Sequence, residues 1–173
     1  LFVLRGADGA LRAFYNVCQH RAHELLKGRG NVASVIVCPY HAWTYELDGA
    51  LRGARSTKKM PDFDPAAYGL EPVRLETPFG FLFVNLDPLA RPLAELAGDM
   101  FDDMEAEMPW VDRLAINPKF SMVPGERALL DANWKVAAEN CLECYHCGPA
   151  HRDFVDMIDI PHYTLTQHGA WMK

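Results

Sequence analysis

Four potential metal ligands lie in two short pairs near the start of the chain. Cys18 and His20 form the first pair and Cys38 and His41 form the second, with the 17 residues 21–37 between them. A cluster of two irons and two sulfides takes two protein ligands on each iron, and imidazoles in place of thiolates on one iron raise its reduction potential. The pattern Cys-x-His followed by Cys-x-x-His therefore predicts a [2Fe-2S] cluster held between two loops, and with it a redox protein.

Zinc is the alternative occupant, because two Cys and two His also suit a tetrahedral ion. Zinc fingers pair Cys with Cys and His with His, whereas each loop here supplies one of each. This mixed supply lets each loop reach both irons of a cluster, so the pattern favours the cluster over zinc. His23 is a further imidazole three residues after His20, and we expect it to be a hydrogen-bonding or interface residue.

The composition argues against several classes of protein. A net charge of −6 disfavours nucleic acid as a partner, because phosphates attract basic surfaces. No apolar run reaches the length of a membrane span, and no signal-peptide pattern is present, so we expect a cytoplasmic protein. Five cysteines, two of them assigned to the cluster, disfavour a disulfide framework. The first residue is not Met, and we expect a fragment of a longer polypeptide.

The first half of the chain has the pattern of short strands. Asp8-Gly9 and Asp48-Gly49 are hairpin signals between strand-like segments. Many short strands with glycine-rich turns indicate a small antiparallel β-domain up to about residue 87. The expected strands cover residues 1–5, 11–16, 32–38, 43–47, 50–53 and 79–86.

A helical period replaces the strand pattern from Pro92 onward. Apolar residues recur at steps of three and four with acidic residues opposite them, which predicts one amphipathic helix that ends before Pro109. The acidic face is expected to be solvated. Strands are expected again over 114–129, and a second helix over 131–145.

A second group of potential metal ligands lies at the end of that second helix. Glu143 and His146 are three residues apart and would share a helix face, and Gly148-Pro149 would end the helix and let His151 approach His146. Two imidazoles and one carboxylate form the ligand set of non-haem iron(II) oxygenases, which leaves positions open for oxygen. Three cysteines in the same stretch lack a fourth thiolate nearby and are expected to be buried or capping thiols: Cys141, Cys144 and Cys147.

Together, the two motifs resemble those of the α subunit of Rieske non-haem iron oxygenases. The first matches the family's cluster motif at all four ligands, and the second is similar to its acidic-x-x-His-x-x-x-x-His iron motif. The resemblance covers nearly the whole chain and implies an α+β fold. An antiparallel β Rieske domain over residues 1–90 would precede the first part of an α+β helix-grip catalytic domain over residues 91–173.

The resemblance also implies roles for the residues of the two motifs. His146 and His151 would ligate a mononuclear Fe(II), whose third ligand in the family is an Asp further along, without a counterpart in this chain. Glu143 would bridge this iron to a cluster histidine, His20 or His41, of a neighbouring subunit, which implies a homotrimer or a multiple of one. Electrons would come from NAD(P)H through a separate flavin and iron–sulfur reductase, with O2 and a small molecule as substrates.

The stretch around the second motif resembles the family branch that acts on quaternary ammonium compounds such as glycine betaine, carnitine and choline. Many aromatic-ring dioxygenases have Asp at the bridging position, where this chain has Glu143. N-demethylation or hydroxylation of a quaternary ammonium compound is therefore the favoured reaction, and aromatic-ring hydroxylation is the alternative. A Rieske electron-transfer protein is the alternative from another class, and it leaves the second motif unused. Five aromatic residues could supply a cation-binding cage: Trp134, Tyr145, Phe154, Tyr163 and Trp171.

Overall fold

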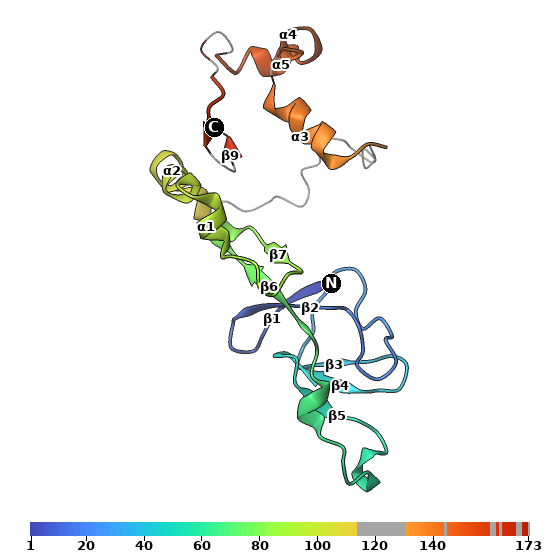
Figure 1. Cartoon of the computed structure of the whole chain (residues 1–173). Coiled ribbons are helices and arrows are strands. Elements are labelled where there is room, and N and C mark those ends of the chain that lie inside the picture. The colour runs from blue at the N-terminus through green and yellow to red at the C-terminus, as the bar shows by residue number, and fades with distance from the viewer. Residues whose placement is uncertain (114–130, 144, 160–161, 163, 169–170, 173) are drawn as a thin grey trace. The chain divides into compact units, whose positions relative to one another are not determined.

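The structure is a computed structural model that describes residues 1–113, 131–143, 145–159, 162, 164–168 and 171–172. The chain divides into two compact units, Leu1–Arg91 and Pro92–Lys173 (Figure 1). The strands expected over 114–129 lie outside the described residues. Among the helices that are described, none is long and apolar enough to cross a membrane.

The first unit contains two sheets, both antiparallel. One has four strands in the order β1-β2-β6-β7 and the other has three in the order β3-β4-β5 (Figure 1). This arrangement confirms the expected antiparallel β-domain. The strands are β1 Phe2–Arg5, β2 Leu11–Phe14, β3 Val35–Val37, β4 Thr44–Glu46, β5 Leu51–Gly53, β6 Pro72–Glu76 and β7 Phe83–Asn85. The short 3-10 helices are η1 Thr57–Lys59, η2 Pro65–Tyr68 and η3 Pro78–Gly80.

Both predicted hairpin turns form. Asp8 Oδ1 accepts the N–H two residues further on at 3.1 Å, and Asp48 Oδ1 accepts the equivalent N–H at 2.9 Å. Each carboxylate therefore stabilises its own turn. The glycines that follow, Gly9 and Gly49, have φ of +82° and +94°, in the left-handed region that glycine enters without strain.

Two strands differ from the expectation. β6 was not predicted, although Val73 is buried and pairs with Ala13 of β2. β7 begins at Phe83, because the segment from Pro78 to Gly80 forms η3 and only then turns into the sheet. The expected strand over 79–86 is therefore too long at its start.

One hydrophobic cluster joins the two sheets of the first unit. It includes Phe14 from β2, Ile36 from β3 and Tyr45 from β4. Burial of each such side chain stabilises the fold by about 1.5–3 kcal/mol. Cys18 and Cys38 belong to the same cluster, so the two loops that carry the candidate iron–sulfur ligands are anchored in the core.

In the second unit, two helices replace the single one expected after Pro92. α1 covers Leu93–Ala97 and α2 covers Met100–Glu107. Gly98 separates them with a φ of +60°, a backbone conformation that ends an α-helix. The prediction of one continuous helix was wrong. The three- and four-residue spacing of apolar residues continues on both sides of Gly98, but the backbone changes direction at this glycine.

The helix before the second motif also ends earlier than expected. α3 covers Trp134–Leu142, and Glu143 is extended, with φ −119° and ψ 142°. Glu143 and His146 therefore do not share a helix face. Gly148-Pro149 does not end a helix either, since both residues lie within the first turn of α4. Proline is tolerated there because the N–H groups of a first turn have no partner within the helix. The remaining elements are η4 Val111–Arg113, α4 Cys147–Ala150, α5 Arg152–Val155, and the paired strands β8 Gln167–His168 and β9 Trp171–Met172.

Substitution of the two hairpin glycines separates backbone strain from packing. A Cβ at Gly49 would lie 2.5 Å from Phe14 Cε1, whereas a Cβ at Gly9 meets nothing within 4 Å. We expect Gly9→Ala to lower the free energy of unfolding by roughly 1 kcal/mol through backbone strain alone. Gly49→Ala should lower it by roughly 3 kcal/mol, because overpacking against Phe14 adds about 1–3 kcal/mol.

Urea denaturation of the full-length protein measures both losses. Gly9→Ala is the matched control, because it has the same turn type and the same change in the unfolded chain. Equal losses for the two variants would contradict the predicted packing of Phe14 against the turn.

Candidate metal centres

The two loops with the candidate cluster ligands close with the same backbone hydrogen bonds. In the first loop, the N–H of Cys18 donates to the carbonyl of His23 at 2.9 Å, and the N–H of Ala22 donates back to the carbonyl of Cys18 at 2.9 Å. The second loop makes the equivalent bonds, at 2.8 Å and 3.0 Å, between Cys38, Trp43 and Ala42. Each cysteine is thus the fixed first residue of a closed turn.

A left-handed alanine completes each turn. Ala22 has φ +55° and Ala42 has φ +58°, a region that non-glycine residues rarely occupy and that adds roughly 1–2 kcal/mol of strain. The same conformation at the same place in both loops gives the two loops one common shape. Strained backbone of this kind persists where the surrounding structure holds it, and it is concentrated at functional sites.

The cysteines and histidines of the loops lie in different environments. Cys18 and Cys38 are free thiols with exposed fractions of 2% and 3%. His20 is exposed and His41 is half-buried, and their ring centroids are 4.7 Å apart at an interplanar angle of 72°. Two buried sulfurs and two neighbouring outer imidazoles fit a [2Fe-2S] cluster with one thiolate-bound iron and one imidazole-bound iron.

The surroundings of His41 favour its neutral form. Partial burial, followed by electrostatic repulsion from His20 and Arg21, lowers the pKa of His41 below its usual value. A metal-ligating histidine must be neutral, so this shift is compatible with the predicted ligand role of His41.

Tyr45 connects the first loop to the core and was missed by the sequence analysis. It is fully buried, and its hydroxyl lies 3.2 Å from Cys18 Sγ while it accepts the N–H of Gln19 at 3.0 Å. Burial, and then the contact with Cys18, raises the pKa of Tyr45 above its usual value. The phenol therefore stays protonated and can donate to a Cys18 thiolate. The sequence did hold a signal for this residue: Trp43 and Tyr45 are two residues apart directly after His41, so on an extended segment their side chains point to the same side.

A cavity of about 610 Å³ opens beside His20 and His41. Aromatic side chains from the second loop and from the segment between β5 and β6 form part of its lining. With the histidines, these are His20, Tyr40, His41, Trp43, Phe63 and Tyr68.

In the second unit, the candidate iron ligands are gathered by a carboxylate. Glu143 Oε1 lies 2.5 Å from His146 Nδ1, and Glu143 Oε2 accepts the N–H of Tyr145 at 2.7 Å. The bond with His146, and then that with the Tyr145 N–H, lowers the pKa of Glu143. A carboxylate on Nδ1 fixes the imidazole and leaves Nε2 for a metal, as second-shell partners of metal-bound histidines do.

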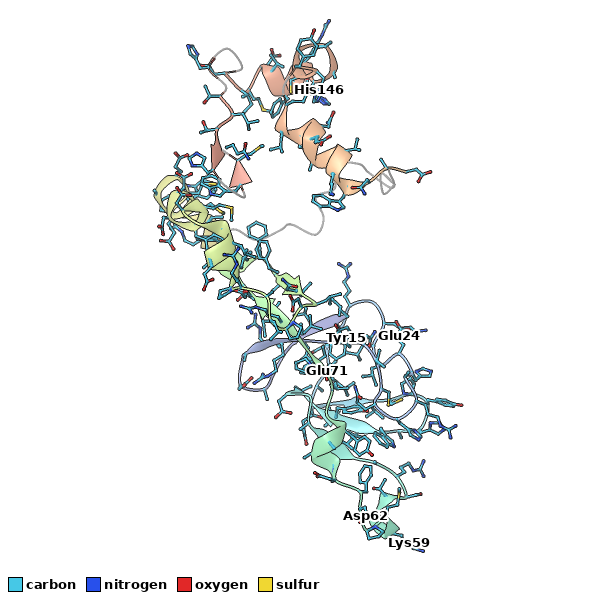
Figure 2. All side chains as sticks on the ribbon, in the orientation of Figure 1. Tyr15, Glu24, Lys59, Asp62, Glu71 and His146 are labelled. Carbon is cyan, nitrogen blue, oxygen red and sulfur yellow. The ribbon has the colours of Figure 1, made fainter. Side chains whose placement is uncertain are left out.

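One short helix sets the spacing of the two histidines. His146 immediately precedes α4 and His151 immediately follows it (Figure 2 labels His146). The N–H of Ala150 donates to the carbonyl of His146 at 3.0 Å, which closes the turn between them. The two rings lie with centroids 5.2 Å apart at 78°. His146 therefore contacts both Glu143 and His151, through a different backbone from the predicted helix.

The candidate ligands are not arranged around a single ion. Within the described part of the chain, no three His, Cys, Asp or Glu side chains, those of the two motifs included, lie where they could hold one metal ion. Cys141 is exposed and Cys147 is buried, while Cys144 lies outside the described residues.

Four of the five aromatic cage candidates lie among the described residues. Among the described ones, no ring contact joins any two, and Trp171 instead stacks on His168 with centroids 4.4 Å apart and donates its Nε1–H to Asp99 at 3.0 Å. Tyr163 lies outside the described residues.

Comparison with known proteins places both centres in one family. The Rieske [2Fe-2S] domain family matches residues 1–64, and the ring hydroxylating alpha subunit (catalytic domain) family matches residues 102–171. The carnitine monooxygenase oxygenase subunit of Escherichia coli (strain K12) is 43% identical over 171 residues, which are 99% of this chain and 44% of that protein. The chain belongs to the Rieske ring-hydroxylating oxygenase family.

Solved Rieske oxygenases have the same fold. A quaternary ammonium Rieske monooxygenase, described in terms of carnitine oxidation and inter-subunit electron transfer, is 39% identical with a TM-score of 0.86 over 98% of this chain and 45% of its own. Naphthalene 1,2-dioxygenase from Rhodococcus sp. is 29% identical with a TM-score of 0.71 over 90% of this chain and 35% of its own. The chain therefore spans less than half the length of each of these relatives.

The two family matches imply a Rieske cluster in the first unit and a mononuclear iron in the second. The residues present fit both groups. The first unit offers two buried thiols and two imidazoles on matched loops, and the second offers two imidazoles beside an oriented carboxylate.

Removal of the Tyr45 hydroxyl tests whether Cys18 is a cluster ligand that accepts its hydrogen bond. If the Cys18 thiolate binds the cluster, donation from Tyr45 stabilises the reduced, more negative state, and Tyr45→Phe should lower the reduction potential. We expect a shift of roughly 50 mV, because a net hydrogen bond contributes about 1 kcal/mol and about 59 mV corresponds to a tenfold one-electron equilibrium change.

An EPR-monitored redox titration of the full-length protein measures this shift. Tyr15→Phe, the same change just beyond the end of β2, is the control and should leave the potential unchanged. An unshifted potential in Tyr45→Phe would show that the hydroxyl makes no bond to the cluster.

Proposed function

We propose that this chain is part of the oxygenase component of a two-component Rieske monooxygenase, which oxidises a quaternary ammonium compound with O2. The observation that supports this most strongly is the presence of both metal motifs, each with its two histidine rings in contact, in a chain 43% identical to the carnitine monooxygenase oxygenase subunit of Escherichia coli (strain K12). A pure electron-transfer protein would have no use for the Glu143–His146 contact.

Each ligand residue has a proposed role. Cys18 and Cys38 hold the inner iron of the cluster, and His20 and His41 hold the outer one. In the second unit, His146 and His151 hold the mononuclear iron, with a third ligand outside this chain. When bound, the cluster supplies electrons one at a time and the mononuclear iron supplies the activation of O2.

Glu143 positions one of these ligands and carries a fixed charge. Its Oε1 contact orients His146, and its lowered pKa keeps it ionised at neutral pH. We propose that the exposed carboxylate also hydrogen-bonds His20 or His41 of a second copy, and so joins the two centres across subunits in a homotrimer or a multiple of one. A separate reductase, fed by NAD(P)H, delivers the electrons.

The substrate class follows from the relatives and sets the expected products. Oxidation of a C–H group beside a quaternary nitrogen consumes O2, two electrons and two protons, and yields C–OH and water. Such a carbinol collapses to an aldehyde and a free amine as its C–N bond breaks. Attack on an N-methyl group therefore releases formaldehyde, while attack on the chain methylene of carnitine releases trimethylamine.

A single turnover of the chemically reduced, full-length protein under O2 tests the proposal. We expect product from at least one of carnitine, glycine betaine and choline, with formaldehyde, trimethylamine and hydroxylated compounds all assayed. Aromatic acids form the second half of the panel. Ring hydroxylation alone would contradict the substrate class, and reoxidation of the cluster without any product would contradict the oxygenase.

The same experiment tests the bridging carboxylate. Glu143→Ala should retain both metal centres and lose at least ten-fold in the rate of cluster reoxidation coupled to product. Glu139→Ala, which removes another exposed glutamate one turn earlier on α3, is the matched control and should react like the wild type. Full turnover by Glu143→Ala would show that this carboxylate does not join the centres.

A further inference from the structure

Trp43 and Tyr45, on either side of Thr44, both contact residues of the first loop. Trp43 and Tyr45 have exposed fractions of 7% and 0%, while Thr44 between them is half-buried. Successive side chains of an extended segment point to opposite sides, so Trp43 and Tyr45 share one side. Tyr45 contacts Cys18, and Trp43 contacts the other ligand of that loop.

Trp43 lies flat against His20. The two rings are stacked with centroids 4.9 Å apart and an interplanar angle of 7°. The backbone of Trp43 is also fixed, because its carbonyl accepts the N–H of Cys38 at 2.8 Å. The indole is therefore anchored by the second loop while its face contacts a ligand of the first.

Two further aromatic rings hold the indole in its plane. Phe63 and Tyr68 present their edges to Trp43 at 5.9 Å and 5.7 Å, with interplanar angles of 83° and 86°. They stack on each other at 4.9 Å and 12°. Edge-to-face contacts of this kind are a favoured arrangement of aromatic rings and stabilise the indole beyond the area that they bury. We name Trp43, Phe63 and Tyr68 the aromatic brace.

His41 is held differently. Its ring contacts are with His20, at 4.7 Å and 72°, and with Tyr40, at 3.8 Å and 34°. Tyr40 is 56% exposed, so His41 rests against a ring on the surface, whereas His20 rests against a buried one. The two candidate ligands of the outer iron thus differ in how firmly their planes are fixed.

We propose that Trp43 is a positioning residue of the Rieske centre, which fixes the imidazole plane of His20 through the aromatic brace and leaves His41 the more adaptable ligand. This inference rests on the proposed ligation of the cluster by His20 and His41. The plane of a ligating imidazole sets its orbital overlap with the iron, and surrounding groups tune a centre through such orientation. The aromatic brace thereby maintains an asymmetry between the two nitrogen ligands.

Nitrogen hyperfine spectroscopy of the reduced cluster tests the inference, on full-length protein labelled with 15N-histidine. Wild type should show two distinct histidine couplings. Trp43→Leu should broaden or shift one of them and leave the other unchanged, and Trp43→Phe, which can still stack, should restore the wild-type pair. Phe14→Leu, a buried change at the core of the same unit, is the control for lost stability and should alter neither coupling.

The outcomes separate this inference from the proposed function. If wild-type protein shows no histidine coupling, the proposed ligation itself is wrong. Two wild-type couplings that survive unchanged in Trp43→Leu would overturn the positioning role while leaving the ligation intact. If Trp43→Leu does not fold, the double variant Phe63→Leu/Tyr68→Leu decides, because loss of both edge contacts should disturb the same coupling, and an unchanged spectrum would overturn the inference.

Discussion

The first unit depends on the burial of two cysteines at the base of two matching loops. Cys18 and Cys38 each donate and accept the backbone hydrogen bonds that close their own loops, and both side chains lie in the hydrophobic cluster of the unit. This anchoring fixes where each loop leaves the core. The imidazoles two and three residues further on can then project beside each other, although the chain between the loops is long.

Local rules made the first unit largely predictable. The Asp-Gly turns form because each Asp side chain bonds the backbone within the same four residues, which needs no knowledge of the rest of the fold. β6 was missed because its pairing with β2 joins residues far apart in the chain, such as Ala13 and Val73. The contacts of Tyr45 and Trp43 with the first loop were missed for the same reason, since tertiary packing alone brings them there.

The second unit shows where spacing misleads. The i, i+3 spacing of Glu143 and His146 predicted their proximity, and they are close, but not on a helix. The Glu143 carboxylate bonds both His146 and the N–H of Tyr145, and such local side-chain bonds compete with helical ones. α3 accordingly ends at Leu142. The ligand roles of these residues stay predictions, as do those of the four residues on the cluster loops.

The most direct test of the account compares two histidines of the first unit by EPR of the reduced, full-length protein. His41→Ala should lose the Rieske signal because the outer iron loses a ligand. His23→Ala should keep it, because His23 Nδ1 donates to the backbone carbonyl of Glu24 at 2.6 Å and His23 is not one of the proposed cluster ligands. A Rieske signal that survives in His41→Ala, or is lost in His23→Ala, would contradict the assignment of the cluster ligands.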